Sequence, residues 1–305
     1  MHQSVKIMKV RIQDQEIPFP LTTISGKLKL CGLSDTATSQ ILKDIKQTKL
    51  ETEEDIFTHI KDALSREPRI ILRSFETLNS YEQLRGTSVE VPPLILALEG
   101  ASATGKSMLA IDFVHYLSIT RFISTDTVRQ VLRGIYTRED YPELYCHTYQ
   151  AYTRRQAGDK NLDPVLRGYI AQCEVIGPPV AEMVNRIYSE GASMIVEGVH
   201  LEPGSIKQIG SGVLEILVNP DEDTHKSMFI TKNIAGKLRT VSKDASTREE
   251  EFLSTRKIQE YMMTKARKNK VPIIELESYE NTRSIISTLI INKVDQIIKE
   301  HQLEG

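Results

Sequence analysis

The sequence contains no tryptophan and only three cysteines among its 305 residues. Cys31, Cys146 and Cys173 are far apart and form no C-x-x-C pair. This pattern argues against a disulfide framework or a cysteine-based zinc site and favours reduced thiols. The chain also lacks a run of about 20 consecutive apolar residues, which a membrane-spanning helix needs.

The chain carries no excess of positive charge, because its formal net charge is −2. The sequence therefore predicts no nucleic-acid partner and no attraction to an anionic membrane. The stretch from Met1 to Lys6 lacks the apolar core of a signal peptide. Since 40% of the residues are hydrophobic, we expect a cytoplasmic globular protein with a sizeable core.

One motif is prominent in this ordinary composition. Residues 100–107 read GASATGKS and match the pattern G-x-x-x-x-G-K-[ST]. The apolar run 93–98 precedes the motif, and the apolar, helix-compatible stretch 108–114 follows it. Strand, glycine loop and helix are the context in which this motif binds phosphate groups.

Each residue type in the motif has a role in binding a nucleoside triphosphate. The glycines let the backbone curl so that its N–H groups and the new helix face an anion. Lys106 would reach the β- and γ-phosphates, and the Ser107 hydroxyl would ligate Mg²⁺. The alternative is a plain glycine turn, but the flanking elements favour a site for ATP and Mg²⁺. The expected nucleotide-binding residues are Gly100, Ala101, Ser102, Ala103, Thr104, Gly105, Lys106 and Ser107.

A change in composition suggests two domains. Gly86-Thr87-Ser88 leads to the prolines 92 and 93, which precede the first buried strand. Residues 1–90 are predicted to form a small α+β domain. Its expected strands are 6–12 and 17–19, and its expected helices lie near 22–32, 35–48 and 51–65.

Residues 91–305 alternate between strand and helix patterns, which is typical of an α/β fold with a parallel sheet. The expected strands are 94–99, 121–124, 193–197, 213–218 and 271–275. The expected helices are 106–118, 126–135, 164–189, 221–233 and 247–269. Since ligands of such sheets bind beyond the carboxyl ends of the strands, we expect the functional side chains there.

Asp126 follows the second of these strands. Its carboxylate could bind metal-bound water or accept the proton of an attacking hydroxyl, a catalytic role. Arg129 and Arg133 lie four residues apart on one helix face, so both guanidinium groups could hold one anionic substrate. The alternative is a helix-capping aspartate followed by two solvated arginines.

Glu197 closes the third strand beside the phosphate loop, where a carboxylate commonly orients Mg²⁺ through water. We therefore predict it as a metal-binding residue together with Ser107, although a solvated glutamate at the sheet rim is the alternative. His200 follows shortly after, and substrate contact and simple packing are equally compatible with its position.

Residues 221–256 are rich in basic side chains and are predicted to form a lid that excludes water during phosphoryl transfer. We favour Lys232 as a substrate-binding residue and Arg256 as a catalytic residue. The alternative is a solvated helix balanced by Glu249–Glu251. The basic residues are His225, Lys226, Lys232, Lys237, Arg239, Lys243, Arg248 and Arg256.

Together these segments resemble archaeal 2-phosphoglycerate kinase over nearly the whole chain. The glutamate–glycine–valine–histidine segment and the lid pattern are more specific than the phosphate loop. The matching stretches are 100–107, Ser124-Thr125-Asp126 with Arg129 and Arg133, Pro164–Tyr169 with Gln172, Glu197–Leu201 with Pro203-Gly204, His225 with Phe229, and Arg256–Tyr261.

The resemblance implies a P-loop kinase that transfers the γ-phosphoryl group of ATP to 2-phosphoglycerate, giving 2,3-bisphosphoglycerate. It also implies that residues 1–90 form an ATP-cone-like domain, although Gln13–Glu16 dilute that module's basic and glycine signature. Dimers are common for such kinases, and a homodimer is one possibility here. The sequence departs from the family at Ala103, where the family more often has glycine. It also departs in the lid at Met228 and Lys232, near places where we would expect arginine.

Two other functions remain open at this stage. The same fold could phosphorylate another phosphorylated or carboxylated metabolite, or a nucleotide. The absence of tryptophan and the basic segment after the second strand disfavour a nucleoside acceptor. The chain could also be a non-catalytic ATP-sensing regulator, which the joint presence of Lys106, Ser107, Asp126 and Glu197 disfavours.

Overall fold

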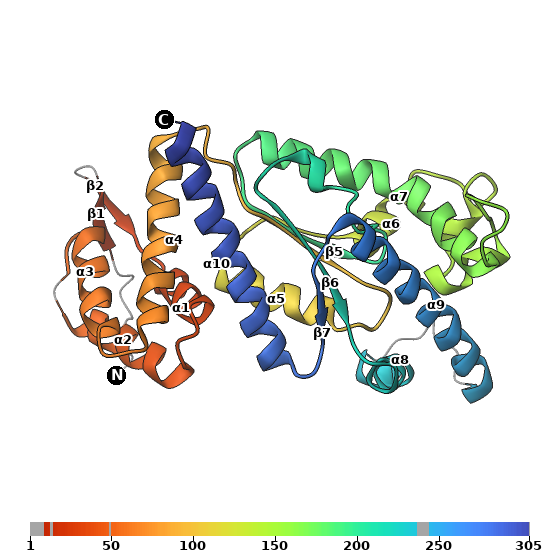
Figure 1. Cartoon of the computed structure of the whole chain (residues 1–305), viewed down its shortest axis with the longest axis horizontal. Helices are drawn as coiled ribbons and strands as arrows, with labels where there is room; N and C mark the ends of the chain where they lie inside the picture. The colour runs from red at the N-terminus through yellow and green to blue at the C-terminus, as the bar shows by residue number, and fades with distance from the viewer. Residues whose placement is uncertain (1–8, 13–14, 49, 237–243, 305) are drawn as a thin grey trace, which may run out of the picture. The chain divides into compact units, whose positions relative to one another are not determined.

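The computed structural model describes residues 9–12, 15–48, 50–236 and 244–304 (Figure 1). These residues cluster into two compact units. The first contains the described residues up to Val91, and also residues 112–119 and 286 onward. The second contains residues 92–111 and 120–285. Two helical segments that the sequence analysis placed in the second domain therefore cluster with the first.

The first unit begins with a hairpin and continues with helices. Thr52 and Asp55 form a reciprocal capping box at the start of α3, which satisfies backbone N–H groups there. Helix α4 was not predicted, and it continues past Gly86, where a side chain would meet open space. The ATP-cone resemblance stays a prediction. The elements are β1 (Lys9–Ile12), β2 (Gln15–Pro18), α1 (Leu21–Leu30), α2 (Asp35–Gln47), α3 (Glu53–Leu64) and α4 (Arg69–Thr87).

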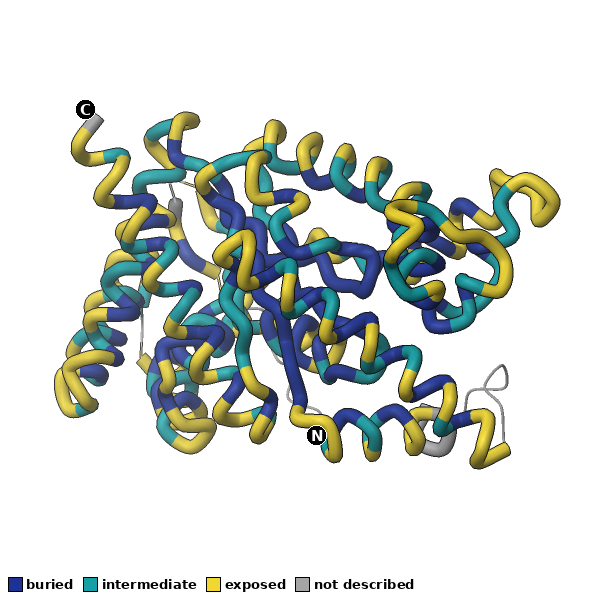
Figure 2. The backbone as a smooth tube through the Cα atoms, turned by 45° about the vertical axis from the view of Figure 1, so that its right-hand side comes forward, coloured by how far each residue is buried: buried dark blue, intermediate teal, exposed yellow. Residues whose placement is uncertain are grey.

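The second unit contains a five-stranded sheet in which every neighbouring pair of strands is parallel. This confirms the predicted fold. The strand order is β4-β5-β3-β6-β7. All residues of β3 and β5 are buried (Figure 2). The strands are β3 (Ile95–Glu99), β4 (Phe122–Ser124), β5 (Met194–Gly198), β6 (Val213–Asn219) and β7 (Ile273–Glu275).

Helices pack on this sheet through apolar side chains. Ile176 and Val180 of α7 share one buried cluster with Ile95 and Ala97 of β3. The sequence analysis assigned no element to α10. The helices are α5 (Lys106–Tyr116), α6 (Thr125–Arg133), α7 (Pro164–Ser189), α8 (Glu222–Gly236), α9 (Ala245–Asn269) and α10 (Tyr279–Glu304), with the short 3-10 helices η1 (Pro142–Tyr145), η2 (Thr148–Thr153) and η3 (Lys207–Ile209). Among the described residues, no helix is long and apolar enough to cross a bilayer.

Two carboxyl groups are buried in the core beneath the phosphate loop. Glu99 ends β3, is fully buried and lies next to the buried carboxyl group of Glu215. Burial, and then the negative charge of Glu215, raise the pKa of Glu99 well above its ordinary value. Glu215 accepts a hydrogen bond from the backbone N–H of Ile206 at 3.1 Å. We therefore expect Glu99 to be protonated at neutral pH.

Replacing Glu99 by Gln should make the protein more resistant to rising pH. Because the folded-state pKa of Glu99 is raised, the unfolded chain releases this proton first as the pH rises above about 4.5. The wild-type protein then loses about 1.4 kcal/mol of stability per pH unit while the folded carboxyl stays protonated. Melting temperatures from pH 5 to pH 8 should therefore show an advantage for E99Q that grows with pH.

The matched control is Glu182→Gln, which changes an exposed carboxylate on α7. Its melting temperatures should follow those of the wild type across the same range. Parallel pH profiles for E99Q and wild type would contradict the buried, protonated state of Glu99.

Candidate active site

A pocket of about 690 Å³ lies at the carboxyl ends of the strands of the second unit. It combines the phosphate loop with side chains that follow β4 and β5 and with one face of α8. Its lining residues are Ser102–Met108, Asp126, Arg129, His147–Tyr149, Glu197–Val199, Met228, Thr231, Lys232 and Tyr279. Six residues predicted from sequence to act in catalysis, metal binding or acceptor binding thus meet in one pocket: Lys106, Ser107, Asp126, Arg129, Glu197 and Lys232.

The phosphate loop contains three left-handed backbone positions. Gly100, Ala103 and Gly105 have φ angles of 146°, 66° and 84°. A Cβ atom on Gly105 would lie 2.8 Å from Leu276 Cδ2, so side chains are excluded there by space as well as by backbone angle. Ala103 adopts its left-handed conformation despite having a side chain, which is costly for a non-glycine residue.

Lys106 lies at the base of the loop and is buried. Its Nζ donates to the carbonyl oxygen of Ala101 at 3.1 Å and lies 4.0 Å from Glu197 Oε2. A lysine between a glycine loop and a strand-end carboxylate can neutralise phosphate charge. The ammonium group of Lys106 is therefore held against the backbone of the phosphate loop at Ala101.

The residues present fit an Mg²⁺ site of the kind that relies on few protein ligands. Ser107 and Glu197 both line the pocket and offer oxygen atoms, which Mg²⁺ prefers. Within the described part of the chain, no group of three or more His, Cys, Asp or Glu side chains could hold a metal ion. Bound Mg²⁺ would therefore depend on phosphate oxygens and water as well, as is usual for this ion.

Asp126 and Arg129 form an ion pair on the first turns of α6, with Arg129 Nη2 3.3 Å from Asp126 Oδ1. Arg129 Nη1 also donates to the carbonyl oxygen of Cys146 at 2.5 Å. Desolvation would raise the pKa of Asp126, but nearby positive charge, including that of Arg129 and Lys106, outweighs it and lowers the pKa. Asp126 is therefore a carboxylate at neutral pH.

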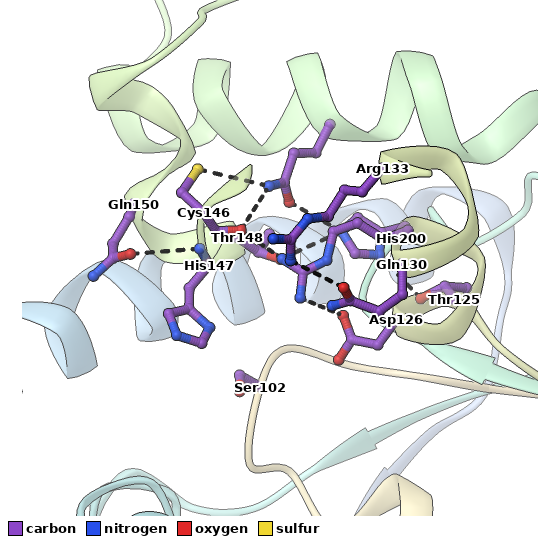
Figure 3. A network of polar contacts seen from close by, with 12 residues as sticks. Ser102, Thr125, Asp126, Gln130, Arg133, Cys146, His147, Thr148, Gln150 and His200 are labelled. Atoms are coloured by element: carbon purple, nitrogen blue, oxygen red, sulfur yellow. Dashed lines mark hydrogen bonds and ion pairs between the residues drawn. The ribbon is translucent and has the colours of Figure 1, made fainter. Parts of the chain in front are cut away.

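His200 lies behind the pocket wall and is not among the lining residues. Its Nε2 lies 3.0 Å from Gln172 Oε1, and its Nδ1 lies 3.0 Å from Thr125 Oγ1 (Figure 3). Because Gln172 Oε1 can only accept, Nε2 carries the proton and Nδ1 accepts from the Thr125 hydroxyl. Burial, and to a smaller extent Arg129, lower the pKa of His200 to about 3.

The neutral His200 therefore supports the site from behind, and its role as a substrate-binding residue stays a prediction. It holds Thr125, the residue before Asp126. Gln172 in turn donates from its amide to the carbonyl oxygens of Glu143 and Cys146. The same Cys146 carbonyl receives the hydrogen bond of Arg129, so one buried network positions Asp126 and Arg129.

Arg133 and Arg256 were also predicted as site residues, and they too lie outside the pocket lining. Arg133 donates to Gln130 Oε1 at 2.9 Å, and its guanidinium carbon lies 4.8 Å from the ring centroid of Tyr145. The two arginines of α6 are therefore not brought together, because the aromatic ring of Tyr145 packs against the second one. Arg256 donates to the carbonyl oxygen of Pro220 at 3.1 Å and pairs with Glu260 at 3.4 Å. Its guanidinium group therefore binds the backbone just after β6.

Helix α8 contacts the tip of the phosphate loop at Ser102. Lys232 Nζ donates to Ser102 Oγ at 3.0 Å, and His225 Nε2 donates to the Ser102 carbonyl oxygen at 2.9 Å. Desolvation, followed by the charge of Lys106, lowers the pKa of Lys232. Among the other basic residues of the predicted lid, Lys226 pairs with Glu249 at 2.6 Å.

The lid segment is only partly described. Lys237, Arg239 and Lys243 lie outside the described residues.

Helix α9 supports the loop through a residue to which the sequence analysis gave no role. The buried Gln259 accepts from the backbone N–H of Ala101 at 2.8 Å and donates to the carbonyl oxygen of Val218 and to Asn219 Oδ1, both at 3.1 Å. The segment Arg256–Tyr261 was noticed only as part of a resemblance. A glutamine in the middle of a helix carries no local signal for such a role.

Replacing Ala103 by Gly should stabilise the protein. The substitution removes the left-handed strain of about 1–2 kcal/mol and adds part of the entropy cost of a glycine. We expect the free energy of unfolding to rise by up to about 1 kcal/mol, measured by urea denaturation. The control is Ala101→Gly, because Ala101 is not in the left-handed region; this variant should lose stability. A loss in both variants would contradict the strain at Ala103.

The chain is similar in sequence to curated archaeal proteins. It is 30% identical over 295 residues to a 2-phosphoglycerate kinase of Methanopyrus kandleri, covering 94% of this chain and 88% of that protein. It is 32% identical over 213 residues to a 2-phosphoglycerate kinase of Pyrococcus furiosus, covering 70% and 68% of the two chains. No family model matches the sequence.

Among solved structures, a shikimate kinase from Acinetobacter baumannii in complex with shikimate aligns with a TM-score of 0.42 and 11% identity, covering 66% of this chain and 94% of that one. The likeness to the curated archaeal proteins covers most of the sequence, including the phosphate loop and the residues after β4 and β5. The chain belongs to the 2-phosphoglycerate kinase family.

Proposed function

We propose that this protein transfers the γ-phosphoryl group of ATP to the free hydroxyl of 2-phosphoglycerate and so forms 2,3-bisphosphoglycerate. The observation that carries the proposal is the single pocket in which the phosphate loop faces Asp126 and Arg129. Phosphoryl transfer needs positioning and charge neutralisation more than covalent chemistry. The membership of the chain in the family supports 2-phosphoglycerate as the acceptor.

The loop end of the pocket suits the nucleotide. The backbone N–H groups of residues 100–107 and the start of α5 would hold the phosphates. Lys106 would neutralise the charge that moves with the transferring group. Ser107 and Glu197 would hold Mg²⁺, which supplies further charge neutralisation when bound.

The other end suits an anionic acceptor. The Asp126 carboxylate is ionised and borders the pocket, so it can orient the acceptor hydroxyl and take its proton. Arg129 offers a positive charge that its contact with Cys146 keeps in place. Lys232 lies at the loop tip, where it can reduce the repulsion between ATP and a charged acid.

The direct test of this function is ³¹P NMR of the protein with Mg-ATP and 2-phosphoglycerate. Resonances of 2,3-bisphosphoglycerate and ADP should grow together in equal amounts. ADP formed without a new phosphate ester would show hydrolysis instead of transfer, and it would contradict the proposal.

Replacing Lys106 by Ala should lower kcat by about 10² to 10³, the usual effect of losing one donor that stabilises developing charge. The rate is measured as ADP release coupled to 2-phosphoglycerate. Lys160→Ala, which removes an exposed lysine, is the control and should keep the wild-type rate. Unchanged turnover in K106A would remove this lysine from the mechanism.

Replacing Arg129 by Ala should raise KM for 2-phosphoglycerate by about tenfold or more, because a hydrogen bond to a charged group contributes about 1.5–3 kcal/mol. KM for ATP should change much less. Arg133→Ala is a matched control on the same helix, since Arg133 lies outside the pocket lining, and both of its KM values should stay close to wild type. Equal losses for both substrates in R129A would contradict the assignment.

A further inference from the structure

The acceptor of the proposed reaction carries a carboxylate and a phosphate, and each needs a partner in the pocket. The lysines and arginines among the described lining residues are Lys106, Arg129 and Lys232. Lys106 contacts Ala101 and Lys232 contacts Ser102, so both ammonium groups lie against the phosphate loop, where the phosphates of ATP would bind. Of these three lining side chains, that of Arg129 is the one that lies away from the phosphate loop.

Two protein groups already engage Arg129, which leaves it less able to hold both anionic groups of the acceptor. Its Nη1 donates to the carbonyl oxygen of Cys146, and its Nη2 pairs with Asp126. The side chain is also largely buried, with 10% of its surface exposed. A second donor on the same wall is therefore needed for the remaining anionic group.

That wall is formed by His147, Thr148 and Tyr149. The Thr148 hydroxyl lies 3.3 Å from His200 Nε2, in the buried network. Tyr149 lies beside Arg248 and packs edge-on against Phe229 at 5.3 Å between ring centroids.

The ring of His147 stacks on Tyr149, with 5.1 Å between centroids and 7° between planes. In Figure 3 the ring lies apart from the side chains of Thr125 and His200. It accepts a hydrogen bond from the backbone N–H of Gln150, and His147 lines the pocket.

We propose that His147 is a further substrate-binding residue that donates a hydrogen bond to one anionic group of the acceptor. Arg129 then holds the other anionic group, and Asp126 faces the hydroxyl between them. This inference rests on the proposed function, because it assumes an acceptor with two anionic groups. It goes beyond the sequence analysis, which assigned no role to residues 134–163.

Helix α9 holds this wall in place. Gln150 donates to Glu251 Oε1 at 2.7 Å, and Arg248 pairs with Glu251 Oε2 at 2.8 Å. The guanidinium carbon of Arg248 lies 4.0 Å from the ring centroid of Phe229 on α8. Because these contacts hold the wall in place, the ring of His147 would need no further ordering when the acceptor binds. This favours binding.

The test compares the wild-type protein with His147→Asn in steady-state kinetics. Asn suits the first position of a helical turn, and His147 precedes η2, so this variant keeps the local fold and removes the ring. KM for 2-phosphoglycerate should rise about tenfold or more, while KM for ATP and the melting temperature should stay close to wild type.

Gln150→Ala separates substrate contact from wall packing. It removes the Gln150 contacts with Glu251 and with the backbone N–H of His147 without changing a side chain that lines the pocket. An unchanged acceptor KM in H147N, or an equal rise in Q150A, would overturn the role of His147. Activity of the wild type with 2-phosphoglycerate tests the proposed function separately, so a failure of His147 alone can be recognised.

Discussion

Electrostatic repulsion between anions is the constraint on which the second unit of this protein depends. A nucleoside triphosphate and a phosphorylated acid repel each other strongly wherever water is excluded. In the proposed reaction Lys106, Lys232 and Arg129 would offset this repulsion. They line one pocket and belong to three different helices. Asp126 and Glu197 lie among them, where carboxylates can act on a metal ion or a hydroxyl.

Buried charges and polar groups of this kind need partners, and much of the surrounding structure provides them. Gln172 and His200 support the start of α6 from the core side. Gln259 fixes the first turn of the phosphate loop to the end of β6. Because these side chains are fully or almost fully buried, their hydrogen bonds cost little further entropy and hold the pocket ready for its ligands.

Helix α8 contacts both the phosphate loop and the wall of the pocket that contains His147. His225 and Lys232 both contact Ser102, whereas Phe229 between them packs against α9 and Tyr149. The helix that carries a cation into the pocket therefore rests on the wall that carries His147. The phosphate loop and the wall that contains His147 therefore share one set of contacts through α8. We expect a change in one of them to affect the other.

The sequence alone determined the parallel sheet, the phosphate loop and the positions of Asp126 and Glu197, because apolar periodicity and a motif of fixed spacing are local signals. It also predicted that side chains after successive strands would meet, since parallel strands end at one edge of the sheet. Only the tertiary structure decided that Arg129 enters the pocket and Arg133 does not, because the difference comes from the ring of Tyr145 twelve residues further along. It likewise placed His200 behind the wall and His147 at its surface, since burial depends on packing between segments that are distant in sequence and leave no local pattern.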